Sequence, residues 1–373
     1  MKSLTDYIAL NRKLQNPSVE YLNDFGELKT NTRALYYSVE TTKKTYRVFA
    51  FISLPKTKKP RSGYPAVIVL HGGNGAAYYE FTEKWAERGF VAIALDLSNK
   101  CATSILARNL INATNCPTDY GSTEDLFTAD PWQYFYTLAA MNAVDVLLGT
   151  NKVNPKKIYA CGLSWGGFLN LSFVSVDQRI SGASIIYSSA FIYETEWGND
   201  PVRLGKFSKK QQEEYIGNID PSNYLMNIKI PVLFTAGMDD LAFNCVQRKR
   251  TSSLISGPVY FAYRQNFKHG NFYGFEQEET YAFFHYLAKG KKIPQPQVAY
   301  KNQVSIRPFY QDSQLELVYA PKPVSSTKKT PFRKIKIVDR HGLTLPKNCG
   351  AYFVVEKYDS LSWSSDLIFN YEA

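Results

Sequence analysis

The segment Lys157-Ile158-Tyr159-Ala160-Cys161-Gly162-Leu163-Ser164-Trp165-Gly166 decides the fold. Its first half is a short apolar run typical of a buried strand, and a helical pattern begins near Gly167. The Gly-x-Ser-x-Gly pentapeptide between them occurs once in the chain. Its glycines suit a turn so sharp that Cβ atoms at positions 162 and 166 would clash with neighbouring backbone. This context predicts a nucleophile elbow that holds Ser164 above a sheet.

Short apolar runs alternate with helical stretches on both sides of this elbow. Because the runs are apolar on both faces, they predict a parallel sheet covered by helices on each side. One crossover helix is expected to open at Asp130-Pro131 and to run through Leu148, closed by Gly149. Residues 35–37 and 46–52 predict an antiparallel pair ahead of the parallel sheet. The predicted parallel strands are residues 66–70, 90–95, 157–161, 183–187, 232–236 and 259–263.

The length of 373 residues suggests one large catalytic-sized domain and a smaller appended one. The helical pattern stops after Gly290, and the rest is β-like with no internal repeat. We therefore expect a first domain over residues 1–294, with a lid insertion at about 190–221, and a small β-sandwich-like domain over 295–373. Strands are expected in this tail at residues 304–306, 315–319, 335–338, 352–355 and 367–371.

A nucleophilic serine needs a base within hydrogen-bond reach. Four histidines are present, and His269 follows the predicted strand 259–263, at the carboxyl edge of the sheet where catalytic loops collect. His71 precedes the serine, His285 lies in an apolar helix and His341 lies in the tail. The sequence therefore predicts His269 as the general base.

The base in turn needs a carboxylate that orients it, and the predicted strand 232–236 runs into Gly237-Met238-Asp239-Asp240. Both aspartates are candidates, since neighbouring side chains point in different directions. Either choice gives the order serine, aspartate, histidine that is typical of nucleophile-elbow proteins.

The loop His71-Gly72-Gly73-Asn74-Gly75 ends the first parallel strand. Its small residues allow a backbone N–H to face a developing oxyanion beside the N–H of Trp165, while His71 is expected to brace the loop by hydrogen bonds. The same loop, with Asp96 about 20 residues on, imitates a dinucleotide-binding fingerprint. Tyr78 takes the place of the third glycine, and its bulk would obstruct the helix–strand contact of that motif.

Composition excludes several classes of protein. The formal net charge is +11, but the basic residues are dispersed and no nucleic-acid motif accompanies them, so a solvated basic surface is expected.

Five cysteines form no Cys-x-x-Cys pair, and neither a structural metal nor a cofactor is predicted. Cys101 and Cys116 bracket one loop and are expected to be free thiols, because a bridge between them would require an oxidising compartment. No apolar run is long enough to span a membrane, and no leader is visible. We expect a cytoplasmic protein for the chain as given, or a secreted or periplasmic one if a leader was removed.

The stretch from about Tyr46 to Gly290 resembles the α/β-hydrolase superfamily, in particular its prolyl-oligopeptidase-like and acetyl xylan esterase-like branch. Its marks are His71-Gly72-Gly73, the segment 162–167, the Gly237-x-x-Asp240 step, and His269-Gly270. The resemblance implies a mostly parallel central sheet flanked by helices, Asp240 rather than Asp239 as the acid, and the Gly73 N–H as second oxyanion donor. This chain has Leu241-Ala242-Phe243 where the family usually continues with Val-Pro.

The resemblance also implies a serine hydrolase that cleaves small acyl esters, in particular acetyl esters of sugars, with a saccharide ester as its partner. About 60 residues precede the hydrolase domain, too few for the propeller of the family's oligopeptidases. Tyr193 and Trp197 in the lid are candidate faces for stacking on a sugar. A compact exopeptidase is the alternative, with Glu194 or Glu196 as partner of the substrate ammonium. More remote alternatives are a dinucleotide-binding oxidoreductase and a non-catalytic binding protein.

Overall fold

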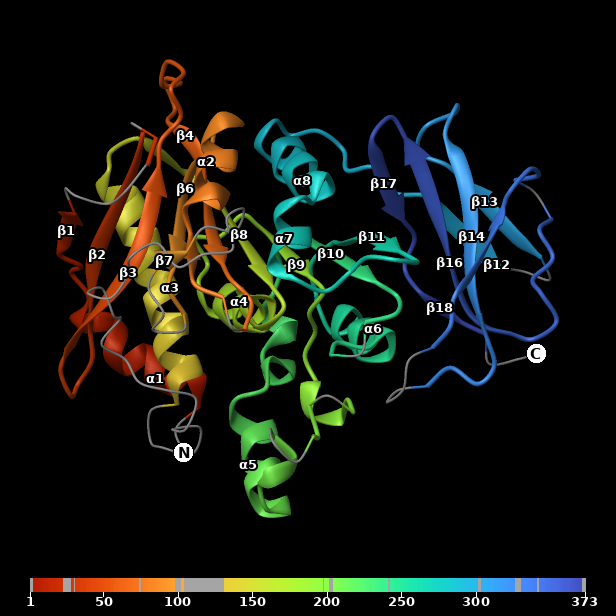
Figure 1. Cartoon of the computed structure of the whole chain (residues 1–373), viewed down its shortest axis with the longest axis horizontal. Coiled ribbons are helices and arrows are strands. Elements are labelled where there is room, and N and C mark those ends of the chain that lie inside the picture. Colours follow the sequence, from red (N-terminus) through yellow and green to blue (C-terminus); the bar gives the residue numbers. More distant parts are fainter. Residues whose placement is uncertain are drawn as a thin grey trace.

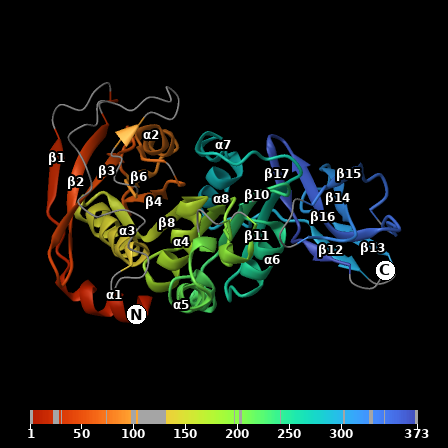
Figure 2. The same cartoon turned by 60° about the horizontal axis from the view of Figure 1, so that its bottom comes forward.

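A hydrogen-bonded sheet runs through the molecule from the N-terminal strands to the C-terminal tail (Figures 1 and 2). The computed structural model describes residues 3–22, 28–29, 31–73, 75–97, 102–103, 131–196, 198–200, 204–240, 242–300, 303–325, 330–340 and 342–370. The strands of the sheet ahead of the tail are β1 (Val19–Leu22), β2 (Thr32–Glu40), β3 (Thr45–Ser53), β4 (Tyr64–Leu70), β6 (Val91–Leu95), β8 (Val153–Leu163), β9 (Gly182–Ile186), β10 (Val232–Gly237) and β11 (Val259–Arg264). The short strands β5 (Ala77–Tyr78) and β7 (Ala102–Thr103) pair separately.

The middle of the sheet is parallel, in the order β6-β4-β8-β9-β10-β11, and β1, β2 and β3 extend it by antiparallel pairing. Every residue of β6, β9 and β10 is buried. Such burial fits their uninterrupted apolar or small-residue sequences, because helices cover both faces of a parallel sheet. The predicted antiparallel pair and the six predicted parallel strands are therefore confirmed.

Helices flank this sheet on both sides (Figure 2). The helices of the described residues are α1 (Leu4–Asn11), α2 (Tyr79–Glu87), α3 (Trp132–Gly149), α4 (Trp165–Val176), α5 (Lys209–Asn218), α6 (Cys245–Ser253), α7 (Asn271–Phe275) and α8 (Glu278–Ala288), of which α5 projects away from the sheet (Figure 1). On one face, Trp85 of α2 packs on Tyr281 of α8 with ring centroids 4.3 Å apart. On the other face, α4 packs against α3, which in turn contacts α1. Single-turn helices are η1 (Arg12–Leu14), η2 (Ile192–Glu194), η3 (Leu204–Lys206), η4 (Pro221–Asn223) and η5 (Leu225–Asn227).

The C-terminal tail consists of strands in the described residues after Gly290. They are β12 (Gln297–Tyr300), β13 (Val304–Arg307), β14 (Gln314–Pro321), β15 (Arg333–Lys336), β16 (Cys349–Tyr358), β17 (Leu361–Ser364) and β18 (Ile368–Phe369). Their sheet has two buried faces. Leu317 and Val354 pack against the β12–β13 hairpin, while Val318 and Phe353 join the main hydrophobic core. This alternation of period two explains why both faces of β14 and β16 are apolar.

The tail is not detached from the sheet, since β17 pairs antiparallel with β11 at Ser364 and Phe261. An α/β architecture with additional C-terminal β structure is thus confirmed. The division of the chain into two domains near residue 295 stays a prediction.

Some predicted element bounds were wrong. Strand β15 ends at Lys336 rather than Val338, and the exposed fraction of Val338 is 91%. Pro131 is extended, with ψ of 144°, so the crossover helix α3 begins at Trp132. The last tail strand is shorter than predicted, and β12 and β17 were not predicted.

Three cysteines, Cys161, Cys245 and Cys349, are free and buried. Cys101 and Cys116 lie outside the described residues, so the expectation that they are free thiols stays a prediction. In the part of the chain that the structure describes, no helix combines the length and the apolar character that crossing a membrane requires.

Candidate active site

Ser164 stands on the sharp turn between β8 and α4. Its backbone has φ of 52° and ψ of −118°, a conformation that L-residues rarely adopt and that surrounding contacts must hold. The Ser164 N–H donates to the carbonyl of Ile186 at 2.9 Å. A Cβ on Gly162 would lie 2.4 Å from the carbonyl oxygen of Gly166, and a Cβ on Gly166 would lie 2.3 Å from that of Leu70. The glycines therefore let the turn close against the end of β4.

The structure brings Ser164, His269 and Asp240 together in one hydrogen-bonded chain. His269 Nε2 lies 2.7 Å from Ser164 Oγ, and His269 Nδ1 lies 2.9 Å from Asp240 Oδ2. The other carboxylate oxygen, Oδ1 of Asp240, accepts hydrogen bonds from the N–H groups of Ala242 and Phe243, at 2.9 and 3.1 Å. Oδ2 is thereby directed at the imidazole. The carboxylate that reaches His269 belongs to Asp240, and the role of Asp240 as the acid of the site stays a prediction.

Two aromatic side chains hold the imidazole of His269. Phe243 lies parallel to it with ring centroids 6.1 Å apart, and Tyr187 packs on it at 4.4 Å. The Tyr187 hydroxyl donates to the carbonyl of Gly270 at 2.5 Å, which fixes the backbone just after the histidine. Burial raises the pKa of Tyr187 well above its usual value, so its hydroxyl remains a donor.

His71 braces the glycine loop in the way that the sequence suggested. Its Nε2 accepts from the Leu97 N–H at 2.8 Å, which leaves the proton on Nδ1, 2.7 Å from the Gly72 carbonyl. The Gly72 carbonyl also accepts from the Gly75 N–H at 3.0 Å. Because C=O and N–H point in opposite directions across a trans peptide, these two bonds fix the direction of the Gly73 N–H.

The Gly73 and Trp165 N–H groups are the predicted oxyanion donors. The two residues are neighbours, since a Cβ on Gly73 would lie 3.8 Å from Trp165 Cβ. Within the described residues, neither N–H has a hydrogen-bond acceptor. The roles of these two N–H groups as oxyanion donors stay predictions.

The predicted lid insertion, residues 190–221, begins beside this site. Ile192 of η2 packs with Phe168 and Phe243, and Trp165 lies against the same cluster. Tyr193 is partly buried against the main core, and burial raises its pKa above the usual range. This environment favours packing over an open stacking face. Trp197 lies outside the described residues, and the roles of both aromatics in substrate binding stay predictions.

Sequence reasoning missed several residues that position the site. Tyr187 follows β9, and Asn271 is the first residue of α7, where its side chain contacts the glycine loop. A tyrosine after a buried strand and an asparagine after His269-Gly270 carry no motif, so a single sequence offered no signal for them. Among the described residues, no group of three or more His, Cys, Asp or Glu side chains lies close enough to hold a metal ion.

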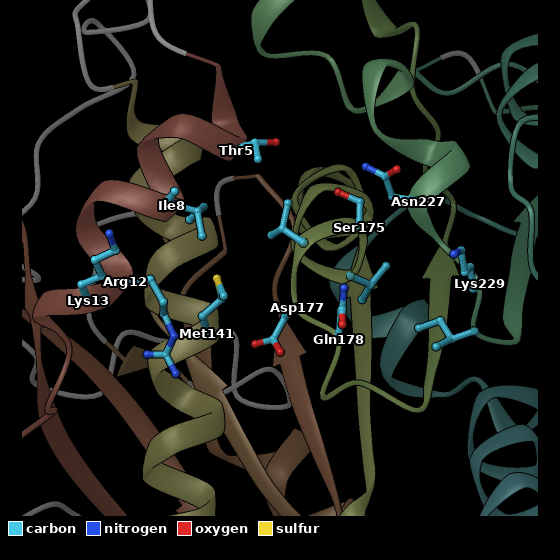
Figure 3. A pocket seen from close by; sticks show the side chains of 14 residues that line it. Thr5, Ile8, Arg12, Lys13, Met141, Ser175, Asp177, Gln178, Asn227 and Lys229 are labelled. Atoms are coloured by element: carbon cyan, nitrogen blue, oxygen red, sulfur yellow. The ribbon is translucent and has the colours of Figure 1, made fainter.

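A separate cavity of about 850 Å³ lies between α1, the C-terminal end of α4 and η5 (Figure 3). Its lining includes Ile8, Met141, Asp177 and Lys229, and none of the three hydrogen-bonded residues. Ser164 precedes the first residue of α4, whereas the cavity touches its last turn. At 1.5 Å per residue, the 12 residues of the helix separate the two places by about 18 Å. This cavity is therefore not the substrate pocket beside Ser164.

Comparison with known proteins identifies the family of the chain. The sequence profile of the dienelactone hydrolase family matches residues 50–259. The chain belongs to the dienelactone hydrolase family, and the α/β-hydrolase resemblance and the hydrolase class are thereby confirmed. A curated relative, the proline iminopeptidase of Lactobacillus crispatus (strain ST1), is 22% identical over 228 residues, which cover 59% of this chain and 70% of that protein.

Solved structures share the fold. The acetyl xylan esterase from Paenibacillus sp. R4 superposes with a TM-score of 0.60 at 16% identity, covering 76% of this chain and 92% of that one. The acylaminoacyl peptidase of Pyrococcus horikoshii gives 0.53 at 14% identity, covering 70% of this chain and 42% of that one. Esterases and peptidases both occur among these neighbours, so the fold leaves the substrate open.

Proposed function

We propose that this hydrolase cleaves small acyl esters through a covalent acyl-enzyme formed on Ser164. The observation that carries the proposal is the chain of hydrogen bonds from Ser164 Oγ through His269 to Asp240. This arrangement gives a serine, at a strained elbow, both a base and a fixed orientation of that base.

In the proposed mechanism, Ser164 Oγ attacks the ester carbonyl while His269 Nε2 takes the hydroxyl proton. The carbonyl oxygen becomes negative and accepts from the N–H groups of Gly73 and Trp165. Collapse of this intermediate expels the alcohol, which receives the proton from His269, and leaves the acyl group on Ser164. Water then attacks the acyl-enzyme with His269 again as base, and the acid leaves as Ser164 is regenerated. The carboxylate of Asp240 stabilises the imidazolium in both steps.

The lid supports an esterase over an exopeptidase. A free-amine exopeptidase needs a carboxylate for the substrate ammonium, and Glu194 was one of two candidates. Glu194 is paired with Arg250, whose guanidinium also lies 4.0 Å from the centre of the Phe191 ring. Its charge is therefore already neutralised.

We extend the proposal to acetyl esters of saccharides as the substrate class. The acetyl xylan esterases with this fold support that choice, and Trp197 is the remaining candidate for stacking on a sugar. The exopeptidase is retained as a second candidate function because Glu196 is exposed on the lid and a curated relative is named a proline iminopeptidase.

A substrate panel tests both levels of the proposal. Wild type and Ser164→Ala are assayed on p-nitrophenyl acetate, acetylated xylose and alanyl- and prolyl-anilides, and a fluorophosphonate probe reports the nucleophile. We expect Ser164→Ala to lose about 10⁴-fold or more in kcat and all labelling. Acetyl esters should be cleaved at least tenfold better than anilides.

Undiminished activity of Ser164→Ala would refute the serine mechanism. Anilides cleaved better than esters, with selective loss in Glu196→Gln but not in the matched Glu194→Gln, would instead establish the exopeptidase.

A further inference from the structure

Asn271 connects the histidine loop to the glycine loop. It lies two residues after His269 and opens α7, with Gly270 between them. Its side-chain Oδ1 accepts from the Gly72 N–H at 3.1 Å, and its Nδ2 donates to the Tyr78 hydroxyl at 3.2 Å. The Gly72 N–H can only donate, so the end of the Asn271 amide that faces it must be the oxygen. This defines the orientation of the amide.

The amide of Asn271 lies against Gly72 and Gly75 of the glycine loop. A Cβ on Gly72 would lie 3.0 Å from Asn271 Oδ1, and a Cβ on Gly75 would lie 3.2 Å from Asn271 Nδ2. The loop is therefore shaped around this side chain. Tyr78 stands where a dinucleotide-binding motif would have its third glycine. It anchors the end of the Asn271 amide that carries Nδ2. Tyr78 is 7% exposed and packs on Phe81.

Hydrogen bonds fix the orientation of two consecutive peptide groups in the glycine loop. His71 and the Gly75 N–H hold the carbonyl of the peptide that carries the Gly73 N–H. Asn271 holds the N–H of the preceding peptide, which is the one between His71 and Gly72. Because the orientations of both peptide groups are fixed, the Gly73 N–H has little freedom to change its direction.

We propose that Asn271 is the positioning residue of the oxyanion hole, which it aligns with the general base through the two-residue connection to His269. This inference rests on the proposed serine mechanism. A neutral amide suits the position, since it supplies an acceptor for Gly72 without a full negative charge near the developing oxyanion. Asn271 does not touch the reacting atoms itself and acts through Gly72 and Gly73.

The test uses two substitutions that separate packing from hydrogen bonding. Asn271→Leu keeps the branched shape and removes both hydrogen bonds, whereas Asn271→Ala removes the shape as well. Glu276→Gln, just after the other end of α7, is the matched control because its side chain is exposed and pairs with Lys84 rather than with the glycine loop. Each variant is assayed for kcat, KM and thermal melting, and for inhibition by a trifluoromethyl ketone, which adds to serine and places an oxyanion in the hole.

Loss of a whole oxyanion donor costs about 10²- to 10³-fold in kcat, so a misaligned donor should cost roughly 10- to 100-fold. We expect this loss in both Asn271 variants, with KM within about threefold of wild type and with ketone affinity reduced by the same factor as kcat/KM. Glu276→Gln should equal wild type.

Three results would overturn the inference. They are full activity in Asn271→Leu, a loss confined to KM, and unchanged ketone affinity despite a lower kcat. Failure of the serine mechanism itself is distinguishable, because it would appear as activity retained in Ser164→Ala.

Discussion

Replacing Asp240 by asparagine tests the hydrogen-bonded chain at its most buried point. The side chain is 2% exposed, and its Oδ1 is held by the N–H groups of Ala242 and Phe243. In Asp240→Asn these donors would keep the amide oxygen in the place of Oδ1 and turn the NH₂ group toward His269 Nδ1. The imidazole would then accept at Nδ1 and carry its proton on Nε2, where it donates to Ser164 instead of taking the serine proton.

The expected loss of kcat in Asp240→Asn can be worked out from the hydrogen bonds of the turn that follows β10. Flipping the amide would restore the productive tautomer, but it would face two N–H donors with an NH₂ group and lose two buried hydrogen bonds. At roughly 1 to 1.5 kcal/mol each, the flip costs about 2 to 3 kcal/mol, so the productive form is reduced roughly 30- to 150-fold. The missing negative charge also destabilises the imidazolium. A total loss of about 10³- to 10⁴-fold in kcat is expected.

The assay is kcat and KM on p-nitrophenyl acetate for wild type, Asp240→Asn and the neighbouring Asp239→Asn. Thermal melting serves as the control for folding. Asp239→Asn should remain within about tenfold of wild type. If Asp240→Asn kept more than a tenth of wild-type kcat while Asp239→Asn lost activity, the interpretation of the turn between β10 and α6 would be refuted.

Two further predictions concern stability. Gly166→Ala should give little soluble protein, or a melting temperature at least about 10 °C lower, because its Cβ would lie 2.3 Å from the Leu70 carbonyl oxygen; normal melting would contradict the packing of the elbow. Burial raises the pKa of Asp220 to about 6, so the folded state favours the protonated form. The Asp220 contribution to stability is fully present below about pH 4 and is lost as pH rises through 6, by up to about 3 kcal/mol. Urea unfolding from pH 4 to 7 should show this decline in wild type and a flatter profile in Asp220→Asn, and parallel profiles would disprove the assignment.

Most of the sheet could be predicted because its strands carry strong local signals. Runs such as 66–70 and 232–236 are apolar or small on both faces and lie between helical patterns, so their burial is determined by composition alone. The tail strands β12 and β17 are different. Strand β12 is mostly exposed, and β17 has only four residues with an alternating pattern, so tertiary pairing rather than local sequence defines them.

The residues of the candidate site also differ in how far the sequence predicts them. The elbow and the histidine were predictable because a motif and a strand end place them, whereas the aspartate needed the direction of two neighbouring side chains. That direction depends on the N–H groups of residues 242 and 243, in the segment that departs from the family pattern. The contacts of Asn271 could not be predicted from the sequence, because its partners Gly72 and Tyr78 are about 200 residues away along the chain.

The tail has a structural consequence for the general base. Without β17, the strand β11 that leads to His269 would be an exposed sheet edge, which is prone to fraying and pairing with other chains. Ser364 Oγ accepts from the Tyr263 N–H at 3.0 Å, and the Gln265 side chain donates to the Phe332 carbonyl at 2.6 Å. These bonds hold residues on either side of the point where β11 ends and the histidine loop begins. The tail therefore both covers the sheet edge and fixes the backbone from which His269 reaches Ser164.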